Sequence, residues 1–491
     1  MASTGLTLRA GPLTVALDRG ELRWVRLGQR EVLRGIYAAV RGPGWVTVAP
    51  RLSSLRVDAG DEAFQVSFEV LHEHGPLRFA WEGRIEGDRE GTLRYVLDGR
   101  ALTSFEKNRI GLCVLHPSEG YAGRPCVVEH GDGTTTHGVF PQDIAPHQPF
   151  RDIRAIRHEV APGRSLEVRV DGEWFEMEDQ RNWSDTSFKT YSTPVEQPLP
   201  ARVEAGTCVR HEVVVRLVAG GVAGIPAKAP APFVRAAPLR VGLTLGESSP
   251  SAAELDRLRT LRPDHLRVDL SLDLGSFVER LAHAGEVSRS CGVPLEVAAT
   301  VPDADEGALG LLAEACARQA APVALLFCYQ RSNGLSDPRL LSAARAALRG
   351  AVPEARIGGG ASGWFADLNR NRGAISGAEA VSVTLCPQAH ARDEATILEN
   401  LGSLGDMART ARSFAGEATL HLTPVTLAPR KEPPDPRLAE AFGGGWVSGL
   451  LRAASEAGFS TLTLGPAFGP GGVVGPHGYT PAAEALLALK D

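Results

Sequence analysis

Four short apolar runs recur between residues 240 and 328: RVGLTL (240–245), HLRVDL (265–270), LEVAAT (295–300) and VALLFC (323–328). Each run carries aliphatic residues on both faces, which is typical of a strand buried on both sides of a parallel sheet. Segments with helical periodicity separate the runs, at Ala252–Leu261, Ser276–Cys291 and Gly307–Gln319. This alternation of buried strands and helices predicts consecutive β–α units.

The same alternation continues to the end of the sequence. Further strands are expected at Ala355–Gly359, Ala380–Leu385, Thr419–Pro424 and Thr461–Leu464, and further helices at Pro338–Leu348, Ala395–Phe414, Gly445–Ala457 and Pro481–Leu489. Only the fifth and sixth strands lack an obvious helix between them. Eight such strands with right-handed crossovers close into a (β/α)8 TIM barrel, and its functional groups lie on the loops after the strand C-termini. We predict this barrel domain over residues 238–491.

Residues 1–220 follow a different pattern. Short alternating runs such as Leu13–Leu17, Phe64–Leu71 and Cys208–Val218 are separated by Gly, Asp and Pro turns. Such alternation is typical of antiparallel strands, and the size and strand number favour a β-sandwich. Residues 221–237 are predicted to be a linker, because the stretch Ala219–Pro238 contains Gly-Gly and repeated Ala-Pro pairs and proline fixes φ and removes a hydrogen-bond donor. The chain is therefore expected to be a multidomain protein.

Composition excludes several classes of function. A formal net charge of -6 gives no basic surface for nucleic acid. No apolar run approaches the roughly 20 residues of a membrane span. Met1–Val15 lacks the apolar core of a signal peptide, so we expect a cytoplasmic protein. Its seven cysteines contain no C-x-x-C pair and are expected to be reduced and mostly buried.

The strand ends disfavour two common barrel chemistries. Many barrel glycosidases place carboxylates after strands four and seven, but Gln330 and Thr423 stand there. The histidines show no His-x-His after strand one and no ligand spacing, so we expect no metal and no cofactor. Gly358–Gly360 could cradle an anion, although a tight turn is the simpler interpretation.

The loop after strand six is the best catalytic prospect. It contains Gln388, His390 and Asp393 within six residues. An imidazole titrates near neutrality, and a nearby carboxylate could orient it as a general base. The structural alternative is that Asp393 caps the helix beginning near Ala395 and that His390 only packs at the barrel mouth.

Residues 176–191, EMEDQRNWSDTSFKTY, form the densest polar and aromatic run in the chain. The run has neither strand nor helix periodicity. Aromatic faces interleaved with carboxylates, amides and a lysine suit a polyhydroxylated ligand, because the rings cover C–H surfaces and the polar groups pair with hydroxyls. The structural alternative is an ordered loop whose charges seal the contact between the two domains.

Together these segments resemble the D-apionate lactonase family, bacterial enzymes that open a branched-sugar lactone during apiose catabolism. The matching stretches span residues 33–41, 108–117, 177–191, 265–270, 368–372, 386–393, 423–427 and 442–446. The likeness covers nearly the whole chain in order, and the run 177–191 is the most specific part of it.

The resemblance implies a hydrolase that opens a sugar-acid lactone similar to D-apionolactone. In the working hypothesis, His390 oriented by Asp393 is the general base, and Arg370 or Arg372 stabilises the oxyanion. Glu178 is the third catalytic candidate. The substrate-binding candidates are Arg181, Asn182, Trp183, Asp185, Lys189, Tyr191, Glu247, Arg267, Asp269, Arg370, Arg372 and Gln388.

Two other functions stay open. A glycoside hydrolase would draw its acids from Glu178, Asp185, Glu247 and Asp269, whereas a non-catalytic sugar-binding relative would leave His390 buried or turned away. All three interpretations depend on Trp183 and His390 lying in one shared pocket.

The sequence also departs from the family pattern. The family is expected to carry a glutamate after strand eight, where this chain has Leu464-Gly-Pro-Ala-Phe468, and Gly359-Gly-Ala-Ser362 stands where relatives tend to have Gly-Gly-Thr-Asn. A further C-terminal β-domain, expected in such proteins, is expected to be absent here. If the glutamate belongs to the catalytic machinery, the chain is a divergent enzyme with another substrate or an inactive relative.

Overall fold

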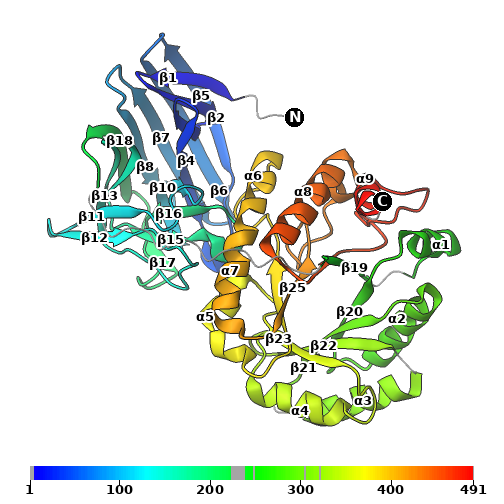
Figure 1. Ribbon diagram of the computed structural model, residues 1–491. Helices are drawn as coiled ribbons and strands as arrows, with labels where there is room; N and C mark the ends of the chain where they lie inside the picture. Colours follow the sequence, from blue (N-terminus) through cyan, green and yellow to red (C-terminus); the bar gives the residue numbers. More distant parts are fainter. Residues whose placement is uncertain (1–4, 223–237, 247–248, 304–305, 320–321, 490–491) are drawn as a thin grey trace. The chain divides into compact units, whose positions relative to one another are not determined.

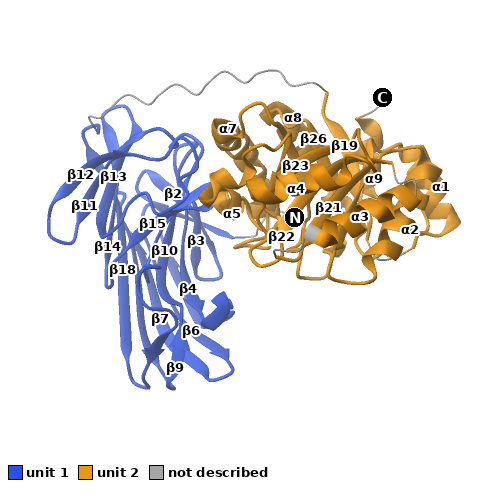
Figure 2. Ribbon diagram, turned by 90° about the horizontal axis from the view of Figure 1, so that it is seen from below, with its two compact units in different colours: residues 1–180, 186–230 blue, residues 181–185, 231–491 orange. Residues whose placement is uncertain are grey.

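The computed structural model describes residues 5–222, 238–246, 249–303, 306–319 and 322–489. The chain divides into two compact units, which Figure 2 shows in different colours. The first unit comprises Met1–Gln180 and Thr186–Pro230, and the second comprises Arg181–Asp185 and Ala231–Asp491. Of the expected linker, residues 223–237 lie outside the described residues. The short segment Arg181–Asp185 thus belongs to the barrel unit, although the chain on either side of it belongs to the first unit.

The first unit is built from antiparallel strands, as predicted. A seven-stranded sheet has the order β1-β2-β3-β4-β10-β16-β15, a nine-stranded sheet has the order β12-β11-β13-β14-β18-β8-β7-β6-β5, and β17 pairs with β9. The strands are β1 Leu6–Ala10, β2 Leu13–Asp18, β3 Glu21–Leu27, β4 Arg30–Arg41, β5 Pro50–Ala59, β6 Phe64–His74, β7 Leu77–Gly87, β8 Leu93–Ala101, β9 Phe105–Lys107, β10 Arg109–Pro117, β11 Pro125–His130, β12 Thr135–Val139, β13 Ile153–Ala161, β14 Arg164–Asp171, β15 Glu176–Asp179, β16 Ser187–Tyr191, β17 Ala201–Val203 and β18 Cys208–Ala219.

The core of this unit lies between the two large sheets. In β6, Phe64, Val66 and Phe68 are buried while the residues between them are exposed. These side chains share one apolar cluster with Leu33 and Leu112 of the other sheet. Two antiparallel sheets that bury one face each against a common core form a β-sandwich, which confirms the predicted architecture.

The second unit contains a closed eight-stranded parallel barrel, again as predicted. Its strands are β19 Arg240–Thr244, β20 His265–Ser271, β21 Leu295–Val301, β22 Val323–Gln330, β23 Arg356–Gly360, β24 Ala380–Leu385, β25 Thr419–Val425 and β26 Thr461–Leu464. Pairing of β19 with β26 closes the ring. Every residue of β24 is buried, including Ser382 and Thr384, as expected for a strand covered on both sides.

Helices surround the barrel strands in Figure 1. They are α1 Ala252–Leu261, α2 Phe277–Cys291, α3 Glu306–Gln319, α4 Pro338–Leu348, α5 Phe365–Arg370, α6 Glu394–Glu399, α7 Leu404–Ala415, α8 Ala441–Ala457 and α9 Pro481–Ala488. Two details differ from the prediction. The short helix α5 connects strands five and six, and a 3-10 turn at Asn400–Ser403 divides the helix expected at Ala395–Phe414 into α6 and α7.

Gly358–Gly360 lie within β23, so neither a loop turn nor an anion cradle describes them. A Cβ atom on Gly358 would stand 2.4 Å from Phe327 Cε1, and one on Gly360 would stand 2.1 Å from Ser382 Oγ. The glycines therefore make room for side chains of the neighbouring strands.

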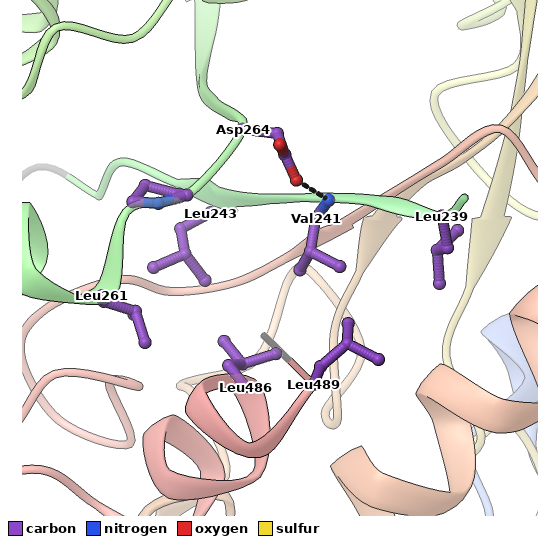
Figure 3. A pocket seen from close by; sticks show the side chains of 8 residues that line it. Leu239, Val241, Leu243, Leu261, Asp264, Leu486 and Leu489 are labelled. Atoms are coloured by element: carbon purple, nitrogen blue, oxygen red, sulfur yellow. Dashed lines mark hydrogen bonds between the residues drawn. The ribbon is translucent and has the colours of Figure 1, made fainter. Parts of the chain in front are cut away.

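At the end of the barrel where the strands begin, a small cavity of about 180 Å³ is lined mainly by leucines and valines, including Leu243, Leu261 and Leu486. Figure 3 shows Asp264 turned toward the β19 backbone, where its Oδ2 accepts a hydrogen bond of 2.7 Å from the amide of Val241. In the part of the chain that the structure describes, no helix is long and apolar enough to cross a bilayer.

Candidate active site

The loop that follows β24 holds the histidine singled out in the sequence. His390 Nδ1 lies 2.6 Å from Asp185 Oδ2. The other carboxylate oxygen of Asp185 accepts a hydrogen bond of 3.1 Å from Asn400 Nδ2, which also donates to the Pro387 carbonyl at 3.0 Å. Because an ionised carboxylate only accepts hydrogen bonds, Nδ1 of His390 carries a proton and donates it to Asp185.

Asp393 does not take the orienting position that we expected for it. It is the N-cap of α6, and its carboxylate accepts bonds from the amide of Thr396 at 3.0 Å and from the Thr396 hydroxyl at 2.8 Å. The position beside His390 belongs to Asp185. The correction has a local cause: an Asp just before a helix satisfies the first-turn amides at little entropic cost.

Trp183 and His390 lie together, as all three interpretations of the sequence required. Their ring centroids are 6.4 Å apart with edge-to-face geometry, and Trp183 contacts Trp364 in the same manner at 5.7 Å. The guanidinium carbon of Arg370 lies 5.5 Å from the Trp183 ring centroid. His390 keeps 19% of its side-chain surface exposed, which leaves it accessible to a small molecule.

The segment Arg181–Asp185 is anchored on both sides of Trp183. Arg181 is fully buried and donates to Asp406 of α7 at 2.7 Å, and Asn182 accepts from Asn369 of α5 at 2.9 Å. Ser184 adopts a left-handed backbone with φ of 72°, which a non-glycine residue takes only when its surroundings impose it. These contacts fix the positions of both Trp183 and Asp185.

A polar cavity of about 240 Å³ lies at the end of the barrel where β19, β20, β25 and β26 finish. Its lining includes three carboxylates and two guanidinium groups, from Asp269, Glu432, Asp435, Arg280 and Arg430. Of these five residues, only Asp269 was predicted from the sequence to belong to the site. Arg280 lies on α2, and the two missed carboxylates follow β25 in a proline-rich stretch, so only their position after the strand-seven end could have indicated them.

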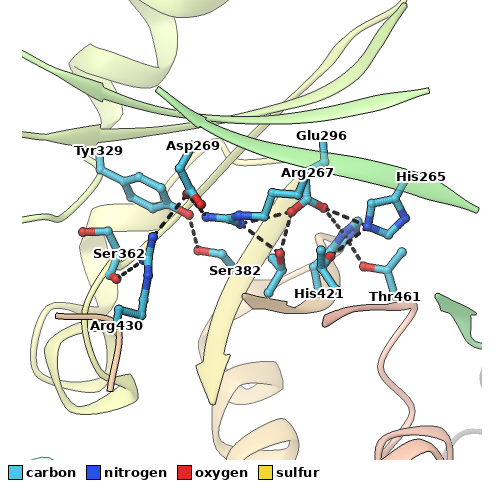
Figure 4. Close-up of polar contacts among 12 residues, drawn as sticks. His265, Arg267, Asp269, Glu296, Tyr329, Ser362, Ser382, His421, Arg430 and Thr461 are labelled. Carbon is cyan, nitrogen blue, oxygen red and sulfur yellow. Dashed lines mark hydrogen bonds and ion pairs between the residues drawn. The ribbon is translucent and has the colours of Figure 1, made fainter. Parts of the chain in front are cut away.

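A series of charged side chains runs from the buried Glu296 and Arg267 to the partly exposed Asp269 and Arg430, as Figure 4 shows. Arg267 is completely buried and donates to Glu296 Oε1 at 3.0 Å and to Asp269 Oδ1 at 2.7 Å. Arg430 Nη2 in turn lies 3.2 Å from Asp269 Oδ1. Burial by itself would raise the pKa of Asp269, but the charges of Arg267 and Arg430 outweigh it and hold that pKa at about 2. Asp269 is therefore a carboxylate at every physiological pH.

Two polar contacts join the His390 loop to the wall of the cavity. Gln388 Nε2 donates to Asp435 Oδ2 at 2.7 Å, and Arg392 Nη2 lies 2.7 Å from Glu432 Oε1. Burial would raise the pKa of Asp435, but hydrogen bonds from Arg437 and Gln388 lower it to about 2. Gln388 is thus a contact of the cavity wall, and the imidazole stands two residues along the chain from it.

Arg372 donates from Nε and Nη2 to Asn369 Oδ1, and its guanidinium carbon lies 5.2 Å from the Phe414 ring centroid, while its role as oxyanion donor stays a prediction. Glu178, Lys189 and Tyr191 belong to the first unit.

Within the first unit these three residues form a buried cluster of their own. Lys189 Nζ lies 2.6 Å from Glu178 Oε2 across the β15–β16 pair and 4.9 Å from the Tyr191 ring centroid. Burial lowers the pKa of Lys189, and the Glu178 charge opposes that shift. Glu247, another predicted site residue, lies outside the described residues.

An eight-stranded parallel barrel whose polar cavity and imidazole–carboxylate pair follow the strand C-termini defines a (β/α)8-barrel enzyme. Comparison with known proteins specifies it further. Residues 2–220 match the family model for the D-apionate lactonase N-terminal domain, and residues 239–490 match the model for the D-apionate lactonase TIM barrel domain. A curated D-apionate lactonase of Brucella anthropi is 31% identical, over 96% of this chain and 84% of that protein. The chain belongs to the D-apionate lactonase family and is a hydrolase of the lactonase class.

Two solved structures that the chain resembles are distant in sequence. A glucosidase from Croceicoccus marinus is 12% identical, over 51% of this chain and 67% of that chain, with a TM-score of 0.35. A beta-arabinopyranosidase is 9% identical, over 94% of this chain and 82% of that chain, with a TM-score of 0.31. Likeness at this level carries no argument about the site.

Proposed function

We propose that this protein hydrolyses the lactone of a five-carbon sugar acid, of the D-apionate type, at the mouth of the barrel. The observation that carries the proposal is the His390–Asp185 pair, held against Trp183 at a strand C-terminus in a chain of the lactonase family. An aromatic face beside polar side chains suits the alternating C–H and hydroxyl surfaces of such a substrate. The cavity at the strand C-termini, whose lining residue Asp435 accepts a bond from Gln388 of the His390 loop, matches a ligand of this size better than a polysaccharide.

In the proposed reaction, Nε2 of His390 removes a proton from a water molecule whose oxygen attacks the lactone carbonyl carbon. Asp185 holds the imidazole by its Nδ1 proton and stabilises the cation that forms. The ring C–O bond then breaks, and the imidazolium returns its proton to the departing oxygen, which becomes the hydroxyl group of the product. The acid product ionises to a carboxylate, so the net reaction consumes one water and releases one proton.

The developing negative charge on the carbonyl oxygen needs a cation or hydrogen-bond donor. Arg372 is engaged with Asn369, and Arg370 packs against the Trp183 ring. The cavity offers two further guanidinium groups, Arg280 and Arg430.

The glycosidase alternative finds less support in the described residues. A glycosidase needs one carboxyl group that stays protonated to donate to the leaving oxygen. Asp269 is unsuited, because two arginines keep its pKa at about 2. Asp185 is bonded to His390, and Glu178 is paired with Lys189.

The test is a pH-indicator assay of the purified protein with a panel of five-carbon sugar lactones and aryl glycosides, corrected for spontaneous lactone opening. Wild-type protein should open at least one lactone, and His390→Ala should lose about 10²-fold or more in kcat, since general-base catalysis contributes that much. His477→Ala, which removes an exposed histidine of the same unit, should leave the rate unchanged. Turnover of His390→Ala within about threefold of wild type would show that His390 is not the general base. Cleavage of an aryl glycoside without opening of any lactone would favour the glycosidase over the lactonase.

The proposal also includes the domain bounds and the cellular compartment. We take the sandwich domain to span residues 1–220, the linker residues 221–237 and the barrel domain residues 238–491, in line with the family matches at 2–220 and 239–490. We further propose a cytoplasmic site of action, because the seven cysteines are free and a reducing compartment keeps them as thiols.

A further inference from the structure

Arg430 has hydrogen-bond donors that point to a ligand. It follows β25, lines the cavity at the barrel mouth and keeps 35% of its side-chain surface exposed. Nη1 donates to the Ser362 carbonyl at 2.7 Å, and Nη2 donates to Asp269 at 3.2 Å. A guanidinium has five N–H donors, so three of them have no acceptor among the residues that the structure describes.

Side chains of the barrel strands fix the position of Arg430. Asp269, its carboxylate partner, is held by Nη2 of the fully buried Arg267, and Arg267 is held by Glu296 and Thr423 at 3.0 and 2.9 Å. Figure 4 shows these side chains in one continuous row that ends at Arg430. A cation held by buried partners loses little conformational freedom when it binds a ligand, which favours tight and oriented binding.

The carboxylates of the cavity lining already have partners. Each contacts an arginine outside the lining: Asp269 contacts Arg267, Glu432 contacts Arg392 and Asp435 contacts Arg437. An anionic ligand in the cavity would therefore meet carboxylates whose charge is compensated, together with the guanidinium groups of Arg280 and Arg430.

A series of contacts also connects Arg430 to Trp183 and His390. Nη1 of Arg430 is bonded to Ser362, and two residues further along the chain Trp364 contacts Trp183, which contacts His390. From the other side, Gln388 joins the His390 loop to Asp435 on the cavity wall. The lining of the cavity is therefore connected to the His390 loop through Asp435 and to the Trp183 cluster through the partner of Arg430, Ser362.

We propose that Arg430 binds the acyl oxygens of the ligand, which are the carbonyl oxygen of the lactone and the two carboxylate oxygens of the sugar acid formed from it. Arg267 and Asp269 are positioning residues that hold Arg430. The ligand class is a small polyhydroxylated carboxylate, because a planar guanidinium pairs with both oxygens of a carboxylate. The part of this inference that concerns the lactone rests on the proposed function, whereas binding of the sugar acid does not.

The test separates this inference from the proposed lactonase function by measuring carboxylate binding and lactone hydrolysis on the same variants. Calorimetry with D-apionate and D-ribonate as carboxylates, and with ribitol as a neutral polyol, compares the wild type with Arg430→Gln, Arg430→Lys, Asp269→Asn and the exposed control Arg452→Gln. Arg430→Gln should weaken carboxylate binding at least 10-fold, leave ribitol unchanged and lower kcat/KM for the lactone about 10²-fold. Arg430→Lys should bind the carboxylates more tightly than Arg430→Gln but less tightly than wild type, because lysine keeps the positive charge without the planar pair of N–H donors. Asp269→Asn should weaken carboxylate binding and leave ribitol unchanged, and Arg452→Gln should match wild type.

Each outcome supports or overturns either the inference about Arg430 or the proposed lactonase function. Wild-type protein that binds neither carboxylate, or Arg430→Gln that keeps wild-type affinity for both, overturns the inference even if lactones are hydrolysed. Carboxylate binding that depends on Arg430 in a protein that opens no lactone supports the inference and rejects the proposed function. Equal weakening of ribitol and carboxylate in Arg430→Gln also overturns the inference, because it indicates a damaged cavity instead of a lost anion contact.

Discussion

Removal of the Glu296 carboxylate tests how the barrel accommodates a fully buried arginine. Glu296 Oε1 accepts bonds from Arg267 at 3.0 Å and from the Thr423 hydroxyl at 2.5 Å, and its side chain is 3% exposed. Burial by itself would raise the pKa of Glu296, but His265 and Arg267 lower it, so the group is a carboxylate in the folded protein. Glu296→Leu keeps the bulk of the side chain and leaves Arg267 with Asp269 as its remaining carboxylate partner.

The expected cost is large because the remaining charge stays buried. Removing one member of a buried ion pair costs about 3–5 kcal/mol. The control is Asp256→Ala, which breaks an exposed pair with Arg259 at 2.7 Å and should cost less than about 1 kcal/mol. The double variant Arg267→Met/Glu296→Leu removes both charges and should be more stable than Glu296→Leu alone.

Scanning calorimetry of the full-length chain measures the effect. A loss of 3–5 kcal/mol in a domain of this size lowers Tm by about 10 °C. A Glu296→Leu protein whose Tm stays within about 2 °C of wild type would refute the reasoning, since Arg267 would then need no second carboxylate. A double variant less stable than the single one would show that packing outweighs charge at this position.

Three further outcomes are expected. Burial lowers the pKa values of His116, His211 and His421 to about 3, 4 and 4, so only the unfolded chain takes up protons between pH 6.5 and about 4. The free energy of unfolding should therefore fall as the pH drops below 6.5, by about 2 kcal/mol for each histidine at pH 5, and a constant value from pH 7 to 5 in urea titrations would contradict this. A thiol reagent should modify the native protein fastest at the exposed Cys208, and the fast phase should vanish in Cys208→Ser. Asp185→Asn should lower kcat for the lactone at least about 10-fold with KM little changed, and an altered KM at constant kcat would argue for a substrate contact instead.

The barrel could be predicted from the sequence because its signal is local. Most of its strands contain short aliphatic runs, and the strand at Ala380–Leu385 was predicted with both ends correct. The errors lie where local propensity is weak. The helix α5 has only six residues, and the 3-10 turn Asn400–Ser403 interrupts a stretch whose apolar periodicity continues through it.

The site could be predicted only in part, since its decisive contacts join residues far apart in the sequence. His390 was identified by its place after a strand, but its partner Asp185 is 205 residues away, and the nearer Asp393 caps a helix instead. The aromatic run around Trp183 was recognised by composition. Composition did not show that Arg181–Asp185 belongs to the barrel unit while Lys189 belongs to the first unit.

The carboxylates of the mouth cavity show why a motif search at the strand ends was insufficient. The sequence analysis noted that the ending of strand eight, Leu464–Phe468, lacks the glutamate expected for the family. In the structure Gly465 and Pro466 line the cavity, and Glu432 and Asp435 from the segment after β25 supply carboxylates to the same lining. The acidic groups of a barrel mouth can thus come from a neighbouring loop, because all strand C-termini face one common space. Loss of an acid at one strand end is therefore weak evidence for loss of activity, and the properties of this mouth depend on how its acids are paired with arginines.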